Sequence, residues 1–517
     1  MLGKLDTQMS FDDITWRERI PKNSFWAKIR EWIQRNITEE DFRPLFSNIG
    51  RPSISPIHTF AALLIQLEKG YSDREMEEES RYDDRVKFAI LAGRNFEGID
   101  AVTLCDHRRL FLNSEIGQKL LNRTLESAKE AGLFSKENLQ VIDSFMIYGK
   151  GAVQDTYTLI RKGVLKVLRI ARFYGIEDEL KAILKRNDYE VPGKPKIDWD
   201  SEEEKQELLE SLVWDALNLV EKAREREPLP EDLASAVELL ERVARQDVKI
   251  REDGRVEMVK GTCKDRVISI TDPEMRHGHK TSSKRVDGYK GHILTCGENG
   301  QLVGGVEVTP ANGADKEPVP EMLEEQEKEG RRPEVVLGDC SYFDPKMIEE
   351  EKAKGTVILA KVPPASNKEG FYTKEEFEID TQAGVVRCPG GNRAEFDVKC
   401  IEERRGSTVL FGAEVCNSCP KRPECTRGKG GRGIRIHPYE PEVQEARRYQ
   451  RTEEFKREYR RRANIERVNS HLIRHGAREA RYIGRVKVKF QLLLCGILNN
   501  IKAVMRAILA KGAVCPA

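Results

Sequence analysis

The most informative segment of the sequence is Tyr459-Arg-Arg-Arg-Ala-Asn-Ile-Glu466-Arg-Val-Asn-Ser-His-Leu-Ile-Arg474. It has no Pro or Gly and is rich in good helix formers, so we predict a helix. Residues three, four, and seven or eight apart share a helix face. The shared face here holds Tyr459, Arg462, Glu466 and Ile473 or Arg474. Glu466 is either a salt-bridge partner or a metal ligand in a basic groove, depending on whether other elements supply further carboxylates.

Two apolar runs far from this helix end in aspartate. One is Leu139-Gln-Val-Ile-Asp143-Ser144 and the other is Glu334-Val-Val-Leu-Gly-Asp339. Each is typical of a short buried strand with a carboxylate at its C-terminal end. Ligands bind at the carboxyl ends of strands in open α/β sheets. For either aspartate alone, the simpler interpretation is a strand-end or turn residue.

The order of the other elements predicts an α/β fold, a sheet flanked by helices. We expect a hairpin over 287–309, a helix over 318–329, a helix over 345–354, a strand over 356–360 and a terminal amphipathic helix over 490–509. Two segments interrupt this pattern. Residues 154–262 are helical and strongly charged, with no residue set that suggests chemistry, and residues 364–440 are rich in Gly and Cys.

The N-terminal region, residues 1–135, has the period of an all-α domain. An apolar helix from His58 to Lys69 ends at Gly70, and Ser72-Asp-Arg-Glu75 is a capping box that opens a second helix. Another helix is expected over about 106–131. Helix, short turn, helix is typical of a DNA-binding helix-turn-helix and also of a plain αα-hairpin. Because the second helix is acidic, both interpretations stay open.

The net charge of +1 hides a basic segment. Between Lys421 and Lys489 there are 21 Lys and Arg against 9 Asp and Glu. Such a segment in a balanced chain indicates a polyanionic partner, most simply nucleic acid. The alternative is a solvated helix with many ion pairs. No apolar run looks long enough to span a bilayer, and no signal peptide is evident, so we expect a cytoplasmic protein without a membrane partner.

The 11 cysteines are then expected to be reduced, and a cluster of them is interpreted as a metal site before a disulfide. One Cys-x-x-Cys pair with two further thiols can supply four thiolates to a tetrahedral zinc ion. The predicted ligands are Cys388, Cys416, Cys419 and Cys425, with Cys400 as a competing fourth ligand. The alternative is free thiols.

Asp143, Asp339 and Glu466 together suggest catalysis. Three carboxylates converging on one point repel each other unless cations lie between them. Hard oxygen ligands suit Mg²⁺ or Mn²⁺. Two such ions activate a hydroxyl nucleophile and stabilise the leaving oxygen in phosphodiester chemistry. The neighbouring arginines would hold phosphates and offset charge.

The pattern resembles a DDE transposase of a bacterial insertion sequence, with its RNase H-like catalytic domain. Five stretches carry the local resemblance: Asp143-Ser144, residues 152–161, residues 272–278, residues 287–292 and residues 338–343. Tyr459, Arg462 and Glu466 resemble the Tyr-x2-Arg-x3-Glu-x6-Lys signature of one large transposase group. This chain departs from it at the last position, where the spacing lands on Ile473 and Arg474 follows.

The resemblance implies a sequence of metal-dependent steps. Water cuts the element ends and exposes 3′-hydroxyls, which then attack target DNA by transesterification. Asp143 and Asp339 would share metal ions, and Glu466 would complete the second metal site. DNA contacts would come from Tyr459, Arg462 and Arg474, with His277 and Lys290 as further candidates that could equally be surface residues. Acting on two ends implies a homodimer on DNA.

Four parts follow from these patterns. They are an N-terminal helical domain (1–135), a discontinuous catalytic domain (136–153, 263–363 and 441–517), a helical insertion (154–262) and a Cys-rich insertion (364–440). Two other functions compete with transposition. One is an RNase H-like nuclease that cuts without joining. The other is a catalytically inactive, transposase-derived DNA-binding protein, against which the presence of all three acids argues.

Overall fold

A computed structural model describes residues 1–5, 11–134, 138–226, 228–261, 263–281, 283–365 and 370–514. Its centre is a curled mixed sheet of six strands with the order β4-β5-β1-β7-β8, where β6 also pairs with β5. The strands are β1 (Leu139–Tyr148), β4 (Arg276–Thr281), β5 (Lys284–Cys296), β6 (Leu302–Pro310), β7 (Val335–Gly338) and β8 (Val357–Ala360). β5 runs antiparallel to β1, β4 and β6, whereas β1, β7 and β8 are parallel. The α/β class predicted from the sequence is confirmed.

Asp143 does not end its strand, and this corrects the sequence prediction. β1 continues to Tyr148 because β5 pairs with it along the whole stretch from Val141. The parallel pairing of β1 with β7, in contrast, covers only residues 139–141 of β1. Asp143 therefore follows the end of that parallel pairing, and Asp339 directly follows β7. Both aspartates lie at the carboxyl edge of the parallel part of the sheet.

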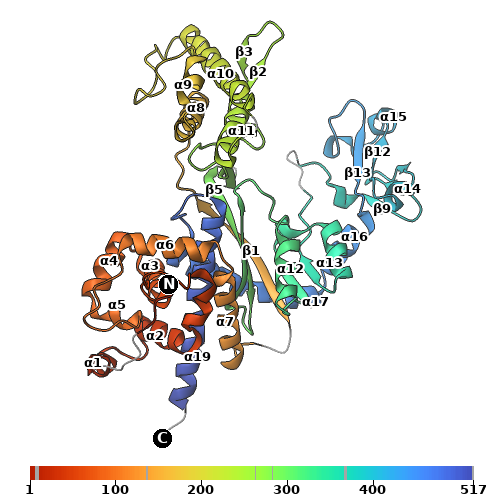
Figure 1. The fold of residues 1–517 in the computed structure, drawn as a ribbon. Helices are drawn as coiled ribbons and strands as arrows, with labels where there is room; N and C mark the ends of the chain where they lie inside the picture. Colours follow the sequence, from red (N-terminus) through yellow and green to blue (C-terminus); the bar gives the residue numbers. More distant parts are fainter. Residues whose placement is uncertain are drawn as a thin grey trace.

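Helices cover both faces of the sheet (Figure 1). α12 (Val319–Lys328) and α13 (Pro345–Ala353) pack on the face that includes Ile142 and Val336. Alternate residues of β1, among them Val141 and Phe145, belong to the core on the opposite face, together with the terminal helix α19 (Arg485–Val514). Since side chains alternate along a strand, Asp143 projects to this second face. The predicted hairpin 287–309 is formed by β5 and β6.

The N-terminal region is helical, as predicted. Its elements are α1 (Phe11–Arg19), α2 (Phe25–Asn36), the 3₁₀ helix η1 (Glu39–Leu45), α3 (Pro56–Lys69), α4 (Asp73–Tyr82), α5 (Asp84–Ala89), α6 (Ala101–Leu112) and α7 (Ile116–Glu130). Ser72 caps α4 with the expected capping box. The single helix expected over 106–131 is instead α6 and α7. The break follows from Ser114, whose hydroxyl donates to the Phe111 carbonyl and accepts from the Ile116 amide.

The N-terminal helices and the sheet share one hydrophobic core. Trp32 and Phe60 belong to the same cluster as Phe145 and Leu492. Polar contacts cross the same boundary, since the Asn500 amide of α19 donates to the Thr124 hydroxyl of α7 at 2.9 Å. The N-terminal helices therefore support the sheet through α19 and α7.

The insertion after β1 forms a separate lobe with its own core (Figure 1). Its elements are α8 (Thr156–Phe173), α9 (Glu177–Ala182), α10 (Glu202–Arg224), α11 (Glu231–Gln246), β2 (Val248–Ile250) and β3 (Val256–Met258). Asp155 caps α8 by accepting from the Thr158 amide. The helical character was predicted, whereas the small β2–β3 hairpin was not.

The Cys-rich insertion forms a small β-rich body at the other side of the molecule (Figure 1). Its elements are η3 (Lys374–Glu376), β9 (Glu378–Asp380), β10 (Val385–Arg387), β11 (Arg393–Glu395), α14 (Lys399–Glu402), β12 (Ser407–Phe411), α15 (Ala413–Asn417), η4 (Arg422–Glu424) and β13 (Arg432–Ile436). Helix α16 (Glu440–Tyr449) leads from it back to the sheet. Its core includes Val386, Phe411 and Ile436.

Helix α19 corrects the expectation that no apolar run of the chain is long enough to span a bilayer. Over Arg485–Lys511 it is long and apolar enough to cross a membrane by length and composition. In the fold, however, 67% of its most apolar window is buried, and Leu494 and Leu498 are in the shared core. The helix is apolar because it packs on the sheet and on the N-terminal helices.

Candidate functional site

The segment 459–474, predicted as one helix, is helical but not continuous. It consists of α17 (Glu453–Arg460), the 3₁₀ turn η5 (Arg461–Asn464), α18 (Ile465–Leu472) and the π-type turn η6 (Ile473–Ala477). A 3₁₀ turn winds more tightly than an α-helix, so it alters the angular positions of the residues that follow it. The contact of Arg462 with Asp143 holds this turn against the sheet.

Asp143 is bound by two side chains of this segment. Arg462 Nη2 donates to Asp143 Oδ1 at 2.9 Å, and Asn469 Nδ2 donates to Asp143 Oδ2 at 2.7 Å. The Asp143 side chain is 14% exposed, and the Arg462 side chain is 17% exposed. Both carboxylate oxygens are therefore oriented by donors from the C-terminal helices.

Asp339 faces the same guanidinium. Its Oδ2 lies 4.0 Å from Arg462 Nη2. Its Oδ1 accepts from the Ser341 amide at 2.8 Å, as the cap of the 3₁₀ helix η2 (Cys340–Tyr342). The two aspartates thus come together from β1 and the end of β7, with one positive charge between them.

Burial raises the pKa of the Asp143 carboxyl, and the nearby Asp339 carboxylate adds to the rise, while the Arg462 guanidinium opposes it. A raised pKa means that burial of this carboxyl group disfavours its ionised form. A divalent cation at this place would reverse the balance by stabilising both carboxylates.

Glu466 lies on α18 between the two residues that bind Asp143. It is three residues before Asn469 on the same helix, so these two side chains share a helix face. Its side chain is exposed. The oxygens of Asp143, Asp339 and Glu466 do not all lie within 4.8 Å of one another. Among the described residues such a trio of acids is formed by Glu307, Glu321 and Glu325.

A polar network lies behind the two aspartates. Ser144 donates to Asp315 Oδ1 at 2.7 Å, and Lys290 Nζ lies 3.1 Å from the same oxygen. Burial lowers the pKa of the nearby His292 to about 4, so this ring is neutral near pH 7. Its Nε2 lies 2.9 Å from the Thr309 hydroxyl. The hydrogen bond from Ser144 to Asp315 holds β1, the strand that carries Asp143, in place within this network.

The remaining predicted DNA contacts are spread over several elements. Tyr459 stacks on Phe455 with ring centroids 5.2 Å apart. Arg474 is exposed in η6. Lys290 is mostly buried, with its amine bonded to the Gly313 carbonyl at 2.8 Å. His277, on β4, has its Nδ1 2.6 Å from Asp287 Oδ1. Asp287 precedes by six residues Ile293, the residue of β5 that pairs with Asp143.

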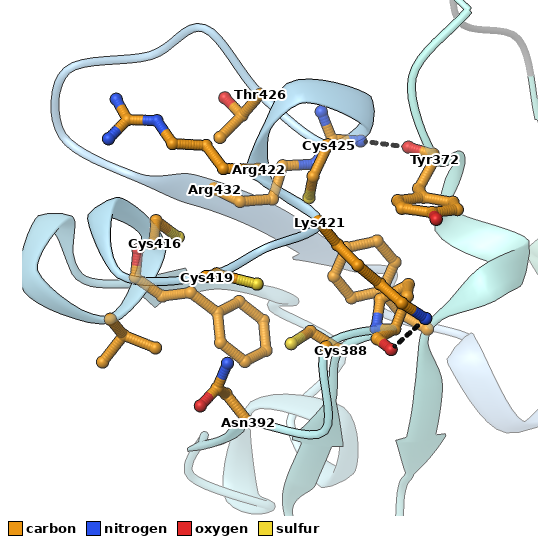
Figure 2. Close-up of a pocket in the computed structure, with 15 residues that line it drawn as sticks. Tyr372, Cys388, Asn392, Cys416, Cys419, Lys421, Arg422, Cys425, Thr426 and Arg432 are labelled. Atoms are coloured by element: carbon orange, nitrogen blue, oxygen red, sulfur yellow. Dashed lines mark hydrogen bonds between the residues drawn. The ribbon is translucent and has the colours of Figure 1, made fainter.

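The four predicted zinc ligands line one small pocket of about 20 Å³ in the Cys-rich insertion. Figure 2 shows Cys388, Cys416, Cys419 and Cys425 around it. Burial raises the pKa of the Cys425 thiol, with contributions from the other three sulfurs. Cys400 is buried and does not line the pocket. The four sulfurs converge, although among the described residues no three of them lie within 4.8 Å of one another.

Two family models match the chain. Residues 387–505 match a model described as transposase DDE domain, and residues 14–110 match one described as transposase domain (DUF772). These two matches support a DDE transposase of an insertion element. The transposase family implies DNA binding, and DDE transposases generally use divalent metal ions. Searches of curated proteins and of solved structures found no match.

The matched DDE segment of the transposase includes Glu466 and the four pocket cysteines, whereas Asp143 and Asp339 precede it. Sequence reasoning missed Asn469 and Asp315. Asn469 had a signal, because it lies three residues after Glu466 on the same helix face. Asp315 had none, because it lies in a loop whose proximity to Ser144 depends on the tertiary fold.

Proposed function

We propose that this transposase cleaves DNA at the element ends and joins them to target DNA, using Asp143, Asp339 and Glu466. The observation that supports it is the meeting of Asp143 and Asp339 on Arg462, beside the helix that carries Glu466. The strand order, with antiparallel β5 next to the parallel strands, supports an RNase H-like assignment of the catalytic domain over 136–153, 263–363 and 441–517.

The donor set fits a hard divalent cation, since it consists of carboxylate oxygens around a position that a guanidinium now neutralises. Two Mg²⁺ or Mn²⁺ ions held by the three acids would activate the attacking hydroxyl and stabilise the leaving oxygen. Asn469 keeps one oxygen of Asp143 oriented. Arg462, with Tyr459 and Arg474, would position the DNA backbone once the guanidinium is released from the aspartates.

A cleavage assay tests the proposal. The substrates are duplexes that contain the DNA flanking the gene, with Mg²⁺ or Mn²⁺ present. Asp143→Asn, Asp339→Asn and Glu466→Gln should each abolish cleavage while leaving DNA binding intact. Glu458→Gln, on α17, is the matched control and should cleave normally. Unchanged cleavage in all three site variants would exclude the assignment.

Strand transfer is measured separately, with pre-cleaved ends and a target plasmid. The proposal expects joined products, whereas a nuclease without joining activity would give none. Gel filtration of the protein bound to two ends should show a homodimer. The expected location is the cytoplasm, where the DNA is.

We also propose that Cys388, Cys416, Cys419 and Cys425 bind a structural Zn²⁺. Their convergence on one small pocket supports this, because thiolates become stable ligands once a cation offsets their charge. Protein purified under reducing conditions should contain one zinc per chain. Cys419→Ser should lose it, and the matched control Cys400→Ser should keep it. Finding no zinc in the parent protein would reject this proposal.

A further inference from the structure

The helical insertion carries a groove that the proposed chemistry does not use. It is formed by α8 and the loop over residues 189–199, and its volume is about 690 Å³. Among its lining residues five are cationic and one is acidic. They are Arg161, Lys162, Arg169, Arg172 and Lys194, with Glu190. In Figure 1 this lobe projects from the sheet beyond the end of β1.

The positive charge is local and does not follow from the composition of the lobe. Residues 154–262 contain 20 Lys and Arg against 25 Asp and Glu. The lobe as a whole is therefore acidic, and its cations are gathered where α8 meets the loop. A basic groove on an acidic body is the pattern expected of a surface that binds a polyanion.

The floor of the groove is held in place by Arg161. Its side chain is buried, and its guanidinium donates to main-chain carbonyls of the loop, including Val191 at 2.7 Å and Gly193. Trp199 packs edge-on against Tyr157 with centroids 5.6 Å apart. The groove is therefore preformed, and a ligand could bind in it without first ordering the loop.

Two cations in the groove have no partner within the described part of the chain. Lys162 is exposed and Arg169 is exposed, and neither makes a hydrogen bond or ion pair there. Lys194 Nζ lies 4.0 Å from Asp155 and 5.0 Å from the centroid of the Trp199 ring, so its only carboxylate contact within the described residues is a long one. Arg172, in contrast, is bonded to Glu177. Unpartnered cations are available to a ligand, whereas Arg172 would first have to leave its carboxylate.

The spacing of these cations suits a nucleic-acid backbone. Lys162 and Arg169 are seven residues apart, so they lie on one helix face about 10 Å apart along the axis. This distance is about three base-pair steps of duplex DNA. We propose that the groove binds the phosphate backbone of duplex DNA, as a site separate from the carboxylate site. The inference rests on the chain acting on DNA and not on the catalytic assignments.

A salt titration of DNA binding tests this proposal. The full chain binds a labelled 40-base-pair duplex of arbitrary sequence over a series of salt concentrations. The groove variant is Lys162→Gln/Arg169→Gln/Lys194→Gln. Losing about three phosphate contacts should make the slope of log K against log salt shallower by between about 2 and 3. Affinity at low salt should fall at least about tenfold.

The matched control removes three cations from the same lobe outside the groove. Lys249→Gln/Arg255→Gln/Lys260→Gln, around the β2–β3 hairpin, should keep the parental slope. A charge-preserving groove variant, Lys162→Arg/Arg169→Lys/Lys194→Arg, should keep most of the affinity. This comparison separates lost charge from a misfolded lobe.

Equal slopes for the groove and hairpin variants would overturn the proposal. So would a groove variant that loses self-association but keeps the parental slope, since the occupant would then be an acidic segment of a second copy. Failure of the cleavage assignment appears in a different assay, as unchanged cutting by Asp143→Asn, Asp339→Asn and Glu466→Gln. The two proposals can therefore fail independently.

Discussion

Replacing Arg462 by Met should destabilise the metal-free transposase and make its stability depend on Mg²⁺. The Arg462 guanidinium donates to Asp143 at 2.9 Å and lies 4.0 Å from Asp339. Without it, two carboxylates face each other with no cation between them. A divalent ion can supply the missing charge in the variant, whereas in the parent protein it competes with the guanidinium.

The magnitude follows from the contacts. A hydrogen bond to a charged group contributes about 1.5–3 kcal/mol, and removing one partner of a buried pair costs about 3–5 kcal/mol. Asp143 keeps some solvent access and still accepts from Asn469. We therefore expect a loss of about 2 kcal/mol. Mg²⁺ at ten times its dissociation constant would return about 1.4 kcal/mol.

The measurement is urea unfolding followed by tryptophan fluorescence, in EDTA and in Mg²⁺. Trp32 reports on the right region, because it is 1% exposed in the core shared with β1. Arg457→Met is the matched control. Its side chain is 72% exposed and pairs with Glu458 at 3.5 Å, so the loss should stay below about 1 kcal/mol. A loss below about 0.5 kcal/mol in the Arg462 variant, or no response to Mg²⁺, would refute the reasoning.

Two further predictions concern pH. The pKa of Asp143 is raised in the folded protein, chiefly by burial. Ionisation of Asp143 therefore lowers the stability of the fold as the pH rises above the ordinary pKa of an aspartate. Asp143→Asn should therefore be more stable than the parent in EDTA at pH 7, and a less stable variant would contradict this. Burial works to raise the pKa of Glu68, but hydrogen bonds from His475 and Lys502 lower it to about 2. Ionised Glu68 therefore stabilises the folded protein at a pH above its unfolded pKa, which is near 4.5, and this stabilisation is lost as the pH falls toward 2. Glu68→Gln should cost about 1–2 kcal/mol at pH 7 after allowance for solvent screening, with the difference from the parent fading by pH 2 in urea titrations.

The strands that carry the aspartates could be found from the sequence because their signal is local. Val335–Gly338 is an apolar run that ends at Asp339, as expected. Asp143 was misplaced within its strand because the polar pair Asp143-Ser144 indicates an end. The ladder with β5 continues past it to Tyr148, and that pairing is a tertiary property.

The meeting of the acids with their partners could be predicted only in outline. The sequence indicates that Glu466 and Arg462 share a helix face, but not that a 3₁₀ turn separates them. That turn depends on docking against the sheet. The contact of Asn469 with Asp143 joins residues 326 positions apart. No spacing rule covers such a contact, because it depends on how α18 packs on β1.

The merging of the N-terminal helices with the sheet was also beyond sequence reasoning. Hydrophobic periodicity identifies a buried face but not the surface that covers it. The apolar face of α19 packs on both parts of the chain, which places Trp32 and Phe145 in one core. The groove of the insertion was missed for a related reason. Lys194 is distant from α8 in sequence, and only the fold brings it beside Lys162 and Arg169 of that helix.

The most direct test of the central claim is anomalous diffraction from Mn²⁺ in crystals of the transposase bound to an end duplex. The account predicts two Mn²⁺ peaks about 3.5–4 Å apart. Oxygens of Asp143 and Asp339 should be bonded to them, Glu466 should complete the second site, and Arg462 should be turned toward DNA. Peaks that no Glu466 oxygen approaches, or an Arg462 guanidinium still between the aspartates with no Mn²⁺ bound, would contradict it.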